Sequence, residues 1–201
     1  VTIAGKKIVP SVAFLNPTGT SRSLLNLGHG AAGQGALIDQ YSPRLKFYRH
    51  LPMKNPVIIL CDNDDGPKDV FSKAAKKSGT KISTTTVDPM YHIEHNLYLV
   101  KVPEGAKPGF RDIEDLFPPV WLGELIDGKA FDKKKEHGDH TSYGKVVFAE
   151  KVVRPNTEKI DFSQFEELLK RIEACILHYG AIKAAKLTLP PLTTVKAGST
   201  G

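Results

Sequence analysis

An apolar run that ends in a cluster of acids is the feature that most constrains this chain. Val57 to Cys61 contains no polar residue, and it is followed directly by Asp62-Asn63-Asp64-Asp65-Gly66. A short apolar run without alternation is typical of a strand that is covered on both faces, as in sheets with parallel strands. We therefore expect a buried strand at 57–61, at or near the centre of a sheet, with an acidic turn at its carboxyl end.

The segments on either side of this strand predict an α/β fold. Pro67 suits the first turn of a helix over 67–78, and Gly79 suits the position just after its last turn. Strand, helix and strand in succession form a βαβ unit and imply a mostly parallel sheet flanked by helices. Three further segments have strand-like composition and are expected to be neighbours in the sheet: Ser11–Leu15, Lys81–Val87 and Leu97–Val102.

The C-terminal half predicts a loop-rich extension followed by a long helix. Within the extension, 113–117 and 121–126 are each expected to form a short helical turn, 129–143 an exposed polar excursion, and 145–153 a strand or a helix. Ser163 and Glu166 have the spacing of a capping box, and apolar residues continue at helical spacing from there to Tyr179. We expect one domain over 1–189, as the length allows a single substantial core, and a flexible tail over 190–201.

Composition and charge narrow the possible environments. No apolar run approaches the length of a membrane span, and no basic-then-apolar leader is present, so we expect a cytoplasmic protein that does not enter a membrane. Cys61 and Cys175 each lie in an apolar run and are expected to be buried free thiols. The net charge of +6 is compatible with a polyanionic partner. Because the chain begins at Val1, we expect it to be part of a longer polypeptide.

Asp62 and Asp64 are the strongest candidates for chemistry. Residues two apart in an extended backbone point to the same side, so the two carboxylates can converge. Two such charges about 6 Å apart would repel by roughly 3 kcal/mol at an effective dielectric constant near 20. A hard divalent cation with oxygen ligands, above all Mg²⁺, would relieve this repulsion. In the alternative interpretation the turn is solvated and Asp64 or Asp65 caps the following helix.

Other patterns give weaker indications. Gly28-His29-Gly30-Ala31-Ala32-Gly33 matches G-x-G-x-x-G but follows a leucine-rich helical turn, so we expect a loop and not a dinucleotide site. His137 and His140 lack further zinc ligands nearby, and His92 and His95 fall on opposite faces of any strand. The run Lys133-Lys134-Lys135 is expected to be a solvated charge run that can also contact a phosphate backbone. Lys145 is the lysine best placed to stabilise a transition-state charge.

An ordered set of motifs resembles one known family. The strand that leads into Asp62-Asn63-Asp64-Asp65-Gly66 is similar to the second motif of TOPRIM domains, a hydrophobic strand followed by D-x-D and a glycine. A closer resemblance covers most of the chain and is to the TOPRIM-like region fused behind the reverse transcriptase of some retrons, which are bacterial antiphage systems. The segments that carry it are Phe14–Thr18, Leu25–Gly28, Asp62–Phe71, Ile113–Phe117, Asp127–Lys129, Tyr143–Ala149 and Ile160–Ser163.

The resemblance implies an Mg²⁺-dependent nuclease (Mn²⁺ being an alternative metal) that acts on DNA, RNA or tRNA beside a reverse transcriptase domain, with oligomerisation open. Asp62 and Asp64 would bind the metal, Glu114 or Asp115 would add a carboxylate, and Lys145 would contact the scissile phosphate. TOPRIM domains also carry a glutamate, usually followed by glycine, at the end of an earlier strand. No glutamate precedes Glu94 here, so we expect that residue upstream of Val1.

Two other functions stay open. In phosphatases of the haloacid-dehalogenase type a strand also ends in D-x-D, and Asp62 would then be a nucleophile, although Pro67 follows Gly66 where such enzymes usually have threonine or valine. Alternatively, the domain is catalytically incomplete and only holds nucleic acid or another subunit, a reading favoured by the +6 charge and the lysine run.

Overall fold

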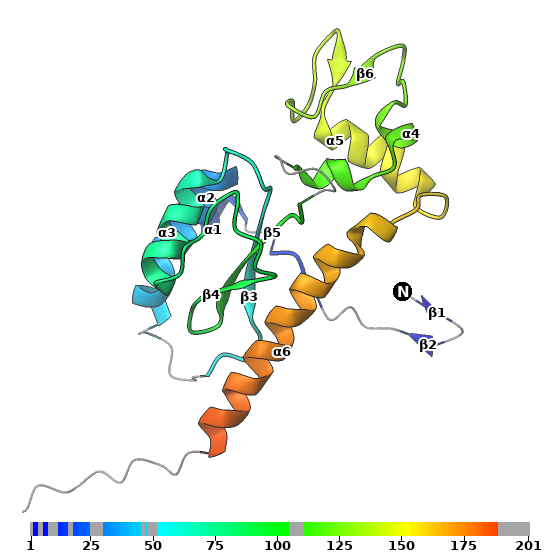
Figure 1. Cartoon of the computed structure of the whole chain (residues 1–201). Coiled ribbons are helices and arrows are strands. Elements are labelled where there is room, and N and C mark those ends of the chain that lie inside the picture. Colours follow the sequence, from blue (N-terminus) through cyan, green and yellow to red (C-terminus); the bar gives the residue numbers. More distant parts are fainter. Residues whose placement is uncertain are drawn as a thin grey trace, which may run out of the picture.

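The computed structural model describes residues 2–3, 6–7, 12–15, 18–24, 30–45, 47, 52–104 and 111–188 (Figure 1). Its strands are β1 (Thr2–Ile3), β2 (Lys6–Lys7), β3 (Val57–Cys61), β4 (Tyr91–Glu94), β5 (Leu97–Lys101), β6 (Ala130–Phe131) and β7 (Ser142–Tyr143). Its α-helices are α1 (Gly19–Leu24), α2 (Gly30–Leu45), α3 (Lys68–Ser78), α4 (Pro119–Leu122), α5 (Lys145–Val147) and α6 (Glu166–Thr188). Short 3₁₀ turns cover Ile113–Leu116, Arg154–Asn156 and Ser163–Phe165, and Phe148–Val153 forms a π-helix.

The main sheet is mixed, with the order β3-β5-β4. β3 pairs in parallel with β5, from Val57 opposite Leu97 to Cys61 opposite Lys101, and β4 pairs antiparallel with β5. Every residue of β5 is buried, as expected of the strand with a neighbour on both sides. The expected strands at 57–61 and 97–102 are therefore present. The strand 57–61, expected at or near the centre, is an edge strand of the described sheet and lies next to the central β5.

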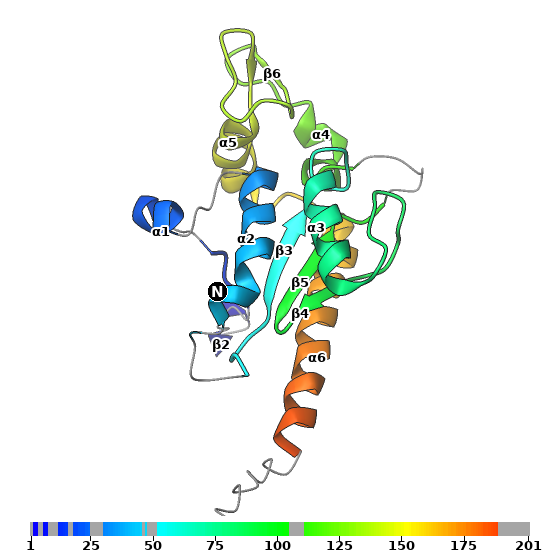
Figure 2. The same ribbon diagram turned by 90° about the vertical axis from the view of Figure 1, so that its left-hand side faces the viewer.

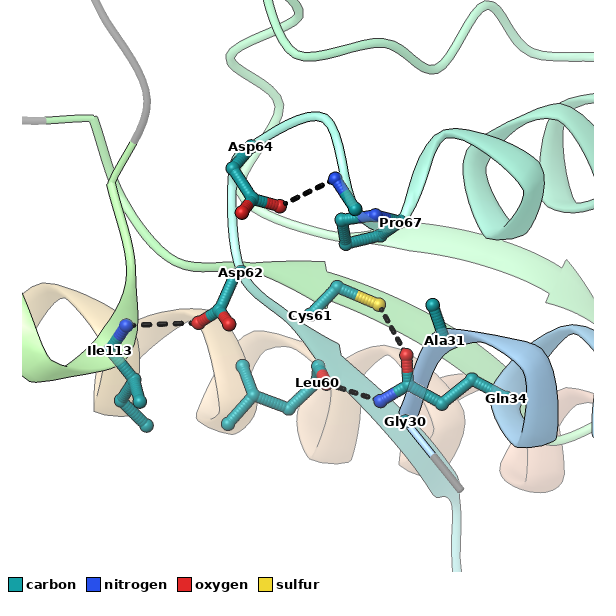
Figure 3. A pocket seen from close by; sticks show the side chains of 10 residues that line it. Gly30, Ala31, Gln34, Leu60, Cys61, Asp62, Asp64, Pro67 and Ile113 are labelled. Atoms are coloured by element: carbon teal, nitrogen blue, oxygen red, sulfur yellow. Dashed lines mark hydrogen bonds between the residues drawn. The ribbon is translucent and has the colours of Figure 1, made fainter. Parts of the chain in front are cut away.

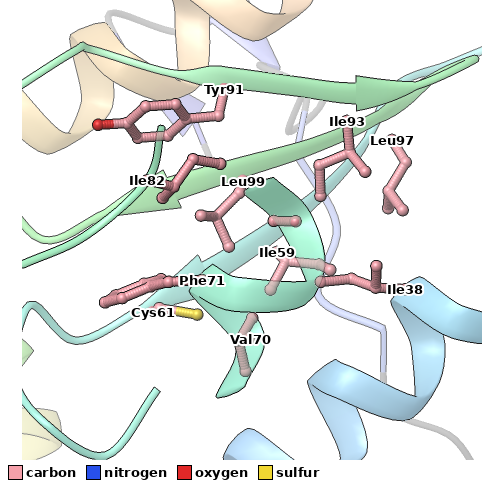
Figure 4. Packing of buried hydrophobic residues seen from close by; sticks show 11 residues of the cluster. Ile38, Ile59, Cys61, Val70, Phe71, Ile82, Tyr91, Ile93, Leu97 and Leu99 are labelled. Atoms are coloured by element: carbon pink, nitrogen blue, oxygen red, sulfur yellow. The ribbon is translucent and has the colours of Figure 1, made fainter. Parts of the chain in front are cut away.

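Helices cover both faces of this sheet, which explains why β3 is apolar without alternation (Figure 2). On one face α2 and α3 pack against Ile59, Cys61 and Leu99 (Figure 4). On the other face α6 packs through Leu168, Cys175 and Tyr179 against Tyr98 and Val100 of β5. The result is a three-layer α/β arrangement. Among the described helices, none has the combination of length and apolarity that a membrane crossing requires.

Helix α3 confirms the expected boundaries. Pro67 lies just before the helix and its carbonyl accepts the N–H of Phe71. Gly79 ends it in the left-handed conformation with φ of 71°, a conformation that costs glycine little because it has no Cβ.

The expected strand over 81–87 is wrong, because this segment forms a turn that is held by its own hydroxyl groups. The Ser83 N–H donates to Thr86 Oγ1, and the Thr86 hydroxyl donates back to the Ser83 carbonyl. Side chains of this kind compete with strand pairing for the backbone groups. The strand is formed instead by Tyr91–Glu94, where buried and half-buried residues alternate before a tight turn at His95, whose φ is 49°.

The N-terminal expectations also need correction. Residues 12–15 of the expected strand Ser11–Leu15 are exposed and belong to no sheet, and Ser11 lies outside the described residues. The glycine-rich stretch is helical from Gly30 onward and not a loop. Its glycines allow close packing: a Cβ on the buried Gly35 would lie 3.1 Å from Asp69 Oδ2 and 3.3 Å from Lys73 Nζ, both on α3.

In the C-terminal half the expected helices form with changed limits. The turn at Ile113–Leu116 is present, and 145–153 is helical. Helix α4 overlaps the expected 121–126 only at its last two residues, since it begins at Pro119 and ends at Leu122. Ser163 is not the N-cap of the long helix; it begins the 3₁₀ turn Ser163–Phe165 that precedes α6, and its N–H donates to Asp161 Oδ1. The helix continues beyond Tyr179 to Thr188. The expected tail over 190–201 lies outside the described residues.

A small lobe with its own core lies near the carboxyl end of β3 (Figure 2). It contains α4, β6, β7, α5 and the π-helix, so the polar excursion expected at 129–143 is partly structured. Its core packs around three buried side chains: Tyr143, Phe148 and Val152. The lobe connects to the sheet layer through the segment 111–117, which carries two of the candidate site residues.

The packing of β5 predicts where the fold is most sensitive. Leu99 has no exposed surface and contributes to the core beneath α3. We expect Leu99→Ala to lower the free energy of unfolding in urea by about 2–5 kcal/mol, because it leaves a cavity in a closely packed layer. The matched control is Leu177→Ala on α6, where the side chain is 66% exposed and a change within about 0.5 kcal/mol is expected. Equal losses in the two variants would contradict this description of the core.

Candidate functional site

Asp62 lies immediately after β3, half-buried, with its carboxylate oriented by the backbone of the next segment. Its Oδ1 accepts the N–H of Ile113 at 2.9 Å (Figure 3). Burial raises the pKa of this carboxyl group above its ordinary value of 3.8; the Ile113 hydrogen bond and the charge of Lys145 oppose the shift, and the charges of Glu114 and Asp112 add to it. Asp62 is thus a carboxylate in a fixed orientation, and burial makes its charged form less favourable than in water.

Asp64 forms the turn that follows. Its Oδ1 accepts the N–H of Gly66 at 2.9 Å, and a Cβ on Gly66 would lie only 3.2 Å from that same oxygen. A glycine at this position therefore lets the turn close tightly. Neither Asp64 nor Asp65 caps α3: Pro67 occupies the N-cap without a side-chain hydrogen bond, and the exposed Asp65 pairs with Lys68 at 2.9 Å. The helix-cap explanation of these acids is therefore not supported.

Both carboxylates line one pocket of about 380 Å³ beside the first turn of α2 (Figure 3). Its walls are formed by Gly30, Ala31, Gln34, Leu60, Cys61, Asp62, Asp64, Gly66, Pro67 and Ile113. Gln34 joins α2 to the edge of β3 that pairs with no strand among the described residues, since its Nε2 donates to the Leu60 carbonyl and its Oε1 accepts from Cys61 Sγ. Asp62 and Asp64 thus both line one opening, and the charges that raise the pKa of Asp62 are those of Glu114 and Asp112.

The two cysteines are free and buried, as expected. Burial, followed by the charges of Asp62 and Asp64, raises the pKa of the Cys61 thiol to about 12. Burial likewise raises the pKa of Cys175 to about 12. Neither sulfur is a nucleophile at neutral pH, because the thiolate is the reactive form. Cys61 thus contributes packing, and a weak hydrogen bond, to the pocket wall.

Glu114 and Lys145 form an ion pair next to Asp62. Lys145 Nζ lies 2.9 Å from Glu114 Oε2, and the Glu114 side chain is only 10% exposed. Burial lowers the pKa of Lys145, but the bond to Glu114 and the charges of Asp62 and Asp112 outweigh it and raise the pKa overall. Lys145 therefore remains a cation within the electrostatic reach of Asp62, and Glu114 is held in place by it.

Asp115 has a structural role in the same segment. Its Oδ2 accepts the N–H of Asp112, which closes the capping box of the 3₁₀ turn. Lys133 Nζ lies 2.9 Å from Asp115 Oδ1 and 3.1 Å from Asp112 Oδ2. Of the two acids that were alternatives for a further ligand, Glu114 is the one whose charge acts on Asp62.

The lysine run does not form one cationic surface. Lys133 is occupied by the acids of the 112–115 turn, and Lys135 Nζ lies 2.6 Å from Asp139 Oδ2 and 3.5 Å from Asp132 Oδ2. Lys134, between them, is exposed. Lys133 and Lys135 are thus held in ion pairs within the protein. Lys134 is the member of the run best placed to contact an external phosphate.

The sequence analysis missed a polar network behind the acidic turn. Lys101, at the end of β5, is only 1% exposed, and its Nζ donates to Asn63 Oδ1 at 3.2 Å and to the carbonyls of Ser83 and Thr86. Asn63 in turn donates to Glu104, which pairs with Arg171 of α6. Burial lowers the pKa of Lys101, and Glu104 opposes this. The sequence pattern that could have indicated this network is the position of Lys101 directly after four apolar residues, 97–100.

Asn63 and Arg111 exchange two backbone hydrogen bonds, 2.9 and 3.1 Å long, which bring the 111–116 segment beside the turn. Within the described ranges, no three histidine, cysteine, aspartate or glutamate side chains are grouped so as to hold a metal ion. The site is thus a pair of carboxylates in one pocket, with Glu114 and Lys145 adjoining it.

Comparison with known proteins adds no identification. No protein-family model matches the chain, and no solved structure matches it.

The raised pKa of Asp62 predicts a pH-dependent cost to stability. The folded protein holds this proton more tightly than the unfolded chain, so ionisation of Asp62 reduces stability as the pH rises from about its ordinary value of 3.8 through the raised value. Asp62→Asn keeps an oxygen that can accept the Ile113 N–H but carries no charge. We expect it to raise the melting temperature by a few degrees at pH 7, and to have no such effect below pH 3.8.

Asp65→Asn is the matched control, since Asp65 is exposed and pairs with Lys68 at the surface. Its melting temperature should change little at either pH. A loss of stability in Asp62→Asn at pH 7 would show that the Lys145 interaction dominates over burial, contrary to the assignment above.

Proposed function

We propose that the turn after β3 binds Mg²⁺ through Asp62 and Asp64 and that the domain is a TOPRIM-type nuclease that cleaves phosphodiester bonds in nucleic acid. The observation that carries the proposal is that both carboxylates line one pocket at the carboxyl end of a strand in parallel pairing. Open α/β sheets bind ligands at this end of their strands. The ordered set of motifs that resembles TOPRIM domains supports the same reading.

The donor set fits the chemistry of magnesium. Mg²⁺ prefers oxygen ligands and is commonly held by one or two carboxylates, with waters and substrate phosphates completing its coordination. Asp62 and Asp64 provide two such groups, and a cation would favour the charged form of Asp62 that burial disfavours. Glu114 would join them only after exchanging its bond with Lys145.

The roles of the chain's own groups follow from their contacts. The Ile113 N–H holds Asp62 in one orientation, and the Asp64–Gly66 turn presents the second carboxylate. Glu114 keeps Lys145 cationic. In this proposal Lys145 binds a phosphate oxygen and stabilises the negative charge that develops there. A bound Mg²⁺ would supply an activated water and neutralise the leaving oxygen. In this proposal the domain acts in the bacterial cytoplasm beside the reverse transcriptase domain of a retron.

One observation favours a second candidate function, a nucleic-acid-binding module without catalysis. Glu114 is already paired with Lys145, and Asp115 is occupied by Lys133 and the capping box, so both acids considered for a further ligand have internal partners. The net charge of +6 would then serve to hold the polyanion alone.

Magnesium titration tests the first proposal. In isothermal calorimetry we expect Asp62→Ala and Asp64→Ala each to weaken Mg²⁺ binding at least about 10-fold relative to the wild type, because each removes one of two charged ligands. Asp65→Ala is the control from the same turn, and we expect a change of less than about 3-fold because Asp65 is exposed and already paired with Lys68.

Cleavage of labelled single-stranded DNA and RNA by this chain is the second readout. Mg²⁺-dependent cleavage that Asp62→Ala and Lys145→Ala abolish is the expected result. Equal Mg²⁺ affinity in wild type and in Asp62→Ala/Asp64→Ala protein would refute the metal site.

Chelation separates the two candidate functions. For the nuclease we expect nucleic-acid affinity in Mg²⁺ to fall about 10-fold when EDTA is added at constant ionic strength, because the metal bridges carboxylates and phosphate. For the binding module the affinity should survive EDTA and fall with salt, by about 0.9 in log–log slope for each duplex phosphate neutralised. Fluorescence anisotropy measures both, with Lys134→Ala as the variant that should reduce the slope.

A further inference from the structure

Asn63 lies between the two acids of the candidate site, and its side chain lies outside their pocket. Asp62 and Asp64 line the pocket, whereas Asn63 does not line it and is only 1% exposed. Side chains alternate between the two faces of an extended backbone, and the bridge between Asn63 and Arg111 extends the strand pairing to this residue. The direction in which Asn63 is fixed therefore affects where the carboxylates on either side of it point.

The side-chain amide of Asn63 is held at both ends by charged groups. Its Oδ1 accepts from Lys101 Nζ at 3.2 Å, and its Nδ2 donates to Glu104 Oε1 at 3.2 Å. An ammonium group only donates and an ionised carboxylate only accepts, so the two charges determine which way the amide is turned. Arg171 of α6 lies 3.4 Å from Glu104 Oε2 and holds this carboxylate in turn. One side chain thus connects the acidic turn to β5 and to α6.

The ammonium group of Lys101 has three N–H groups, and three acceptors surround it. Besides Asn63 Oδ1, these are the carbonyl oxygen of Ser83 at 2.7 Å and that of Thr86 at 2.6 Å. A neutral amine would have only two N–H groups, so the arrangement suits the charged form. The Lys101 side chain has no exposed surface, and a buried charge is unfavourable unless its hydrogen bonds are made. Asn63 is therefore one of three fixed contacts of this cation.

Packing alone does not require a lysine at position 101. The four residues before it, 97–100, are apolar and buried, and its Nζ lies 5.8 Å from the centre of the Phe71 ring. An apolar side chain would fill this space without the cost of burying a charge. What the lysine adds is a connection from the acidic turn to the turn at 83–86.

We propose that Lys101 and Asn63 are positioning residues of the candidate metal site, which together hold the turn so that Asp62 and Asp64 enter one pocket. The inference rests on the proposed function, since it assigns this task to a turn that binds Mg²⁺. Lys101 and Asn63 act through the two aspartates and do not touch the metal. Removal of a group that orients metal ligands in this way typically weakens metal binding about 10- to 100-fold.

Asn63→Ala tests the connection most directly. Lys101 keeps both carbonyl acceptors in this variant, and Glu104 Oε1 lies 3.6 Å from its Nζ, so the cation retains partners. In calorimetry we expect Asn63→Ala and Lys101→Met each to bind Mg²⁺ about 10-fold more weakly than the wild type. The double variant should also lose about 10-fold, because both changes break the same contact and their effects do not add.

Asn96→Ala is the matched control. Asn96 is also only 1% exposed, and its side chain likewise makes two hydrogen bonds, to the Asn55 carbonyl and from the Tyr41 hydroxyl. It lies at the opposite end of the β3–β5 pair, where its carbonyl accepts the Val57 N–H. We expect Asn63→Ala and Asn96→Ala to lower the melting temperature by similar amounts, and only Asn63→Ala to weaken Mg²⁺ binding.

Hydrogen exchange provides a readout that needs no metal. The N–H groups of Ile113 and Gly66 donate to Asp62 and Asp64, so a loosened turn should open these two bonds more often. We expect Asn63→Ala to speed the exchange of both N–H groups about 10-fold, and Asn96→Ala to leave it unchanged.

The outcomes separate this inference from the proposed function. If the wild type binds Mg²⁺ and Asn63→Ala binds it as tightly, the positioning role is refuted while the metal site stands. Equal weakening by Asn63→Ala and Asn96→Ala would indicate a general loss of stability and would also overturn the role. If the wild type does not bind Mg²⁺, the metal site fails. Faster exchange at Ile113 and Gly66 in Asn63→Ala then still supports positioning of the turn, and unchanged exchange overturns it.

Discussion

The parallel hydrogen bonding between β3 and β5 determines where the acidic turn meets the segment that carries Ile113 and Glu114. The ladder runs from the Val57 N–H, which donates to the Asn96 carbonyl, to the Cys61 carbonyl, which accepts the N–H of Val102. Because both strands end at the same edge, the acidic turn after β3 meets the segment after β5. The bridge between Asn63 and Arg111 extends this pairing and brings the Ile113 N–H to Asp62.

Buried charge is the second constraint, and the structure meets it with internal counter-ions. Lys145 neutralises Glu114, Lys133 neutralises the acids of the 3₁₀ turn, and Lys101 and Arg171 share Glu104. A buried charge without a partner would cost several kcal/mol, so these pairs keep the turn and its neighbours in one arrangement. Burial raises the pKa of Asp62, although the Ile113 N–H and the charge of Lys145 oppose the shift. A cation beside Asp62 would favour its charged form, which burial disfavours.

Local sequence predicted the elements whose signals are local. The strand at 57–61 and the helix after it follow from an apolar run, a proline and a glycine, and each signal acts within a few residues. The expectations that failed concern segments whose structure depends on contacts that the local pattern does not show. The threonine-rich segment at 83–86 has strand propensity, yet its hydroxyls bond the backbone of their own turn, while β4 needed the tight turn at His95 and pairing with β5 to form. The glycines of α2 looked like a loop, but they allow the helix to approach α3.

By itself the sequence determined the α/β class, the acidic turn at the end of a buried strand, and the burial of both cysteines. These features follow from apolar runs and from the charged residues next to them, which are local patterns in the sequence. The tertiary structure alone decided that β5 and not β3 is the middle strand of the described sheet, that Lys145 pairs with Glu114, and that Lys101 binds Asn63. The partners in these two contacts lie 31 and 38 positions apart in the sequence, and the contacts depend on how the lobe packs against the sheet and on the pairing of β3 with β5, which no local pattern encodes.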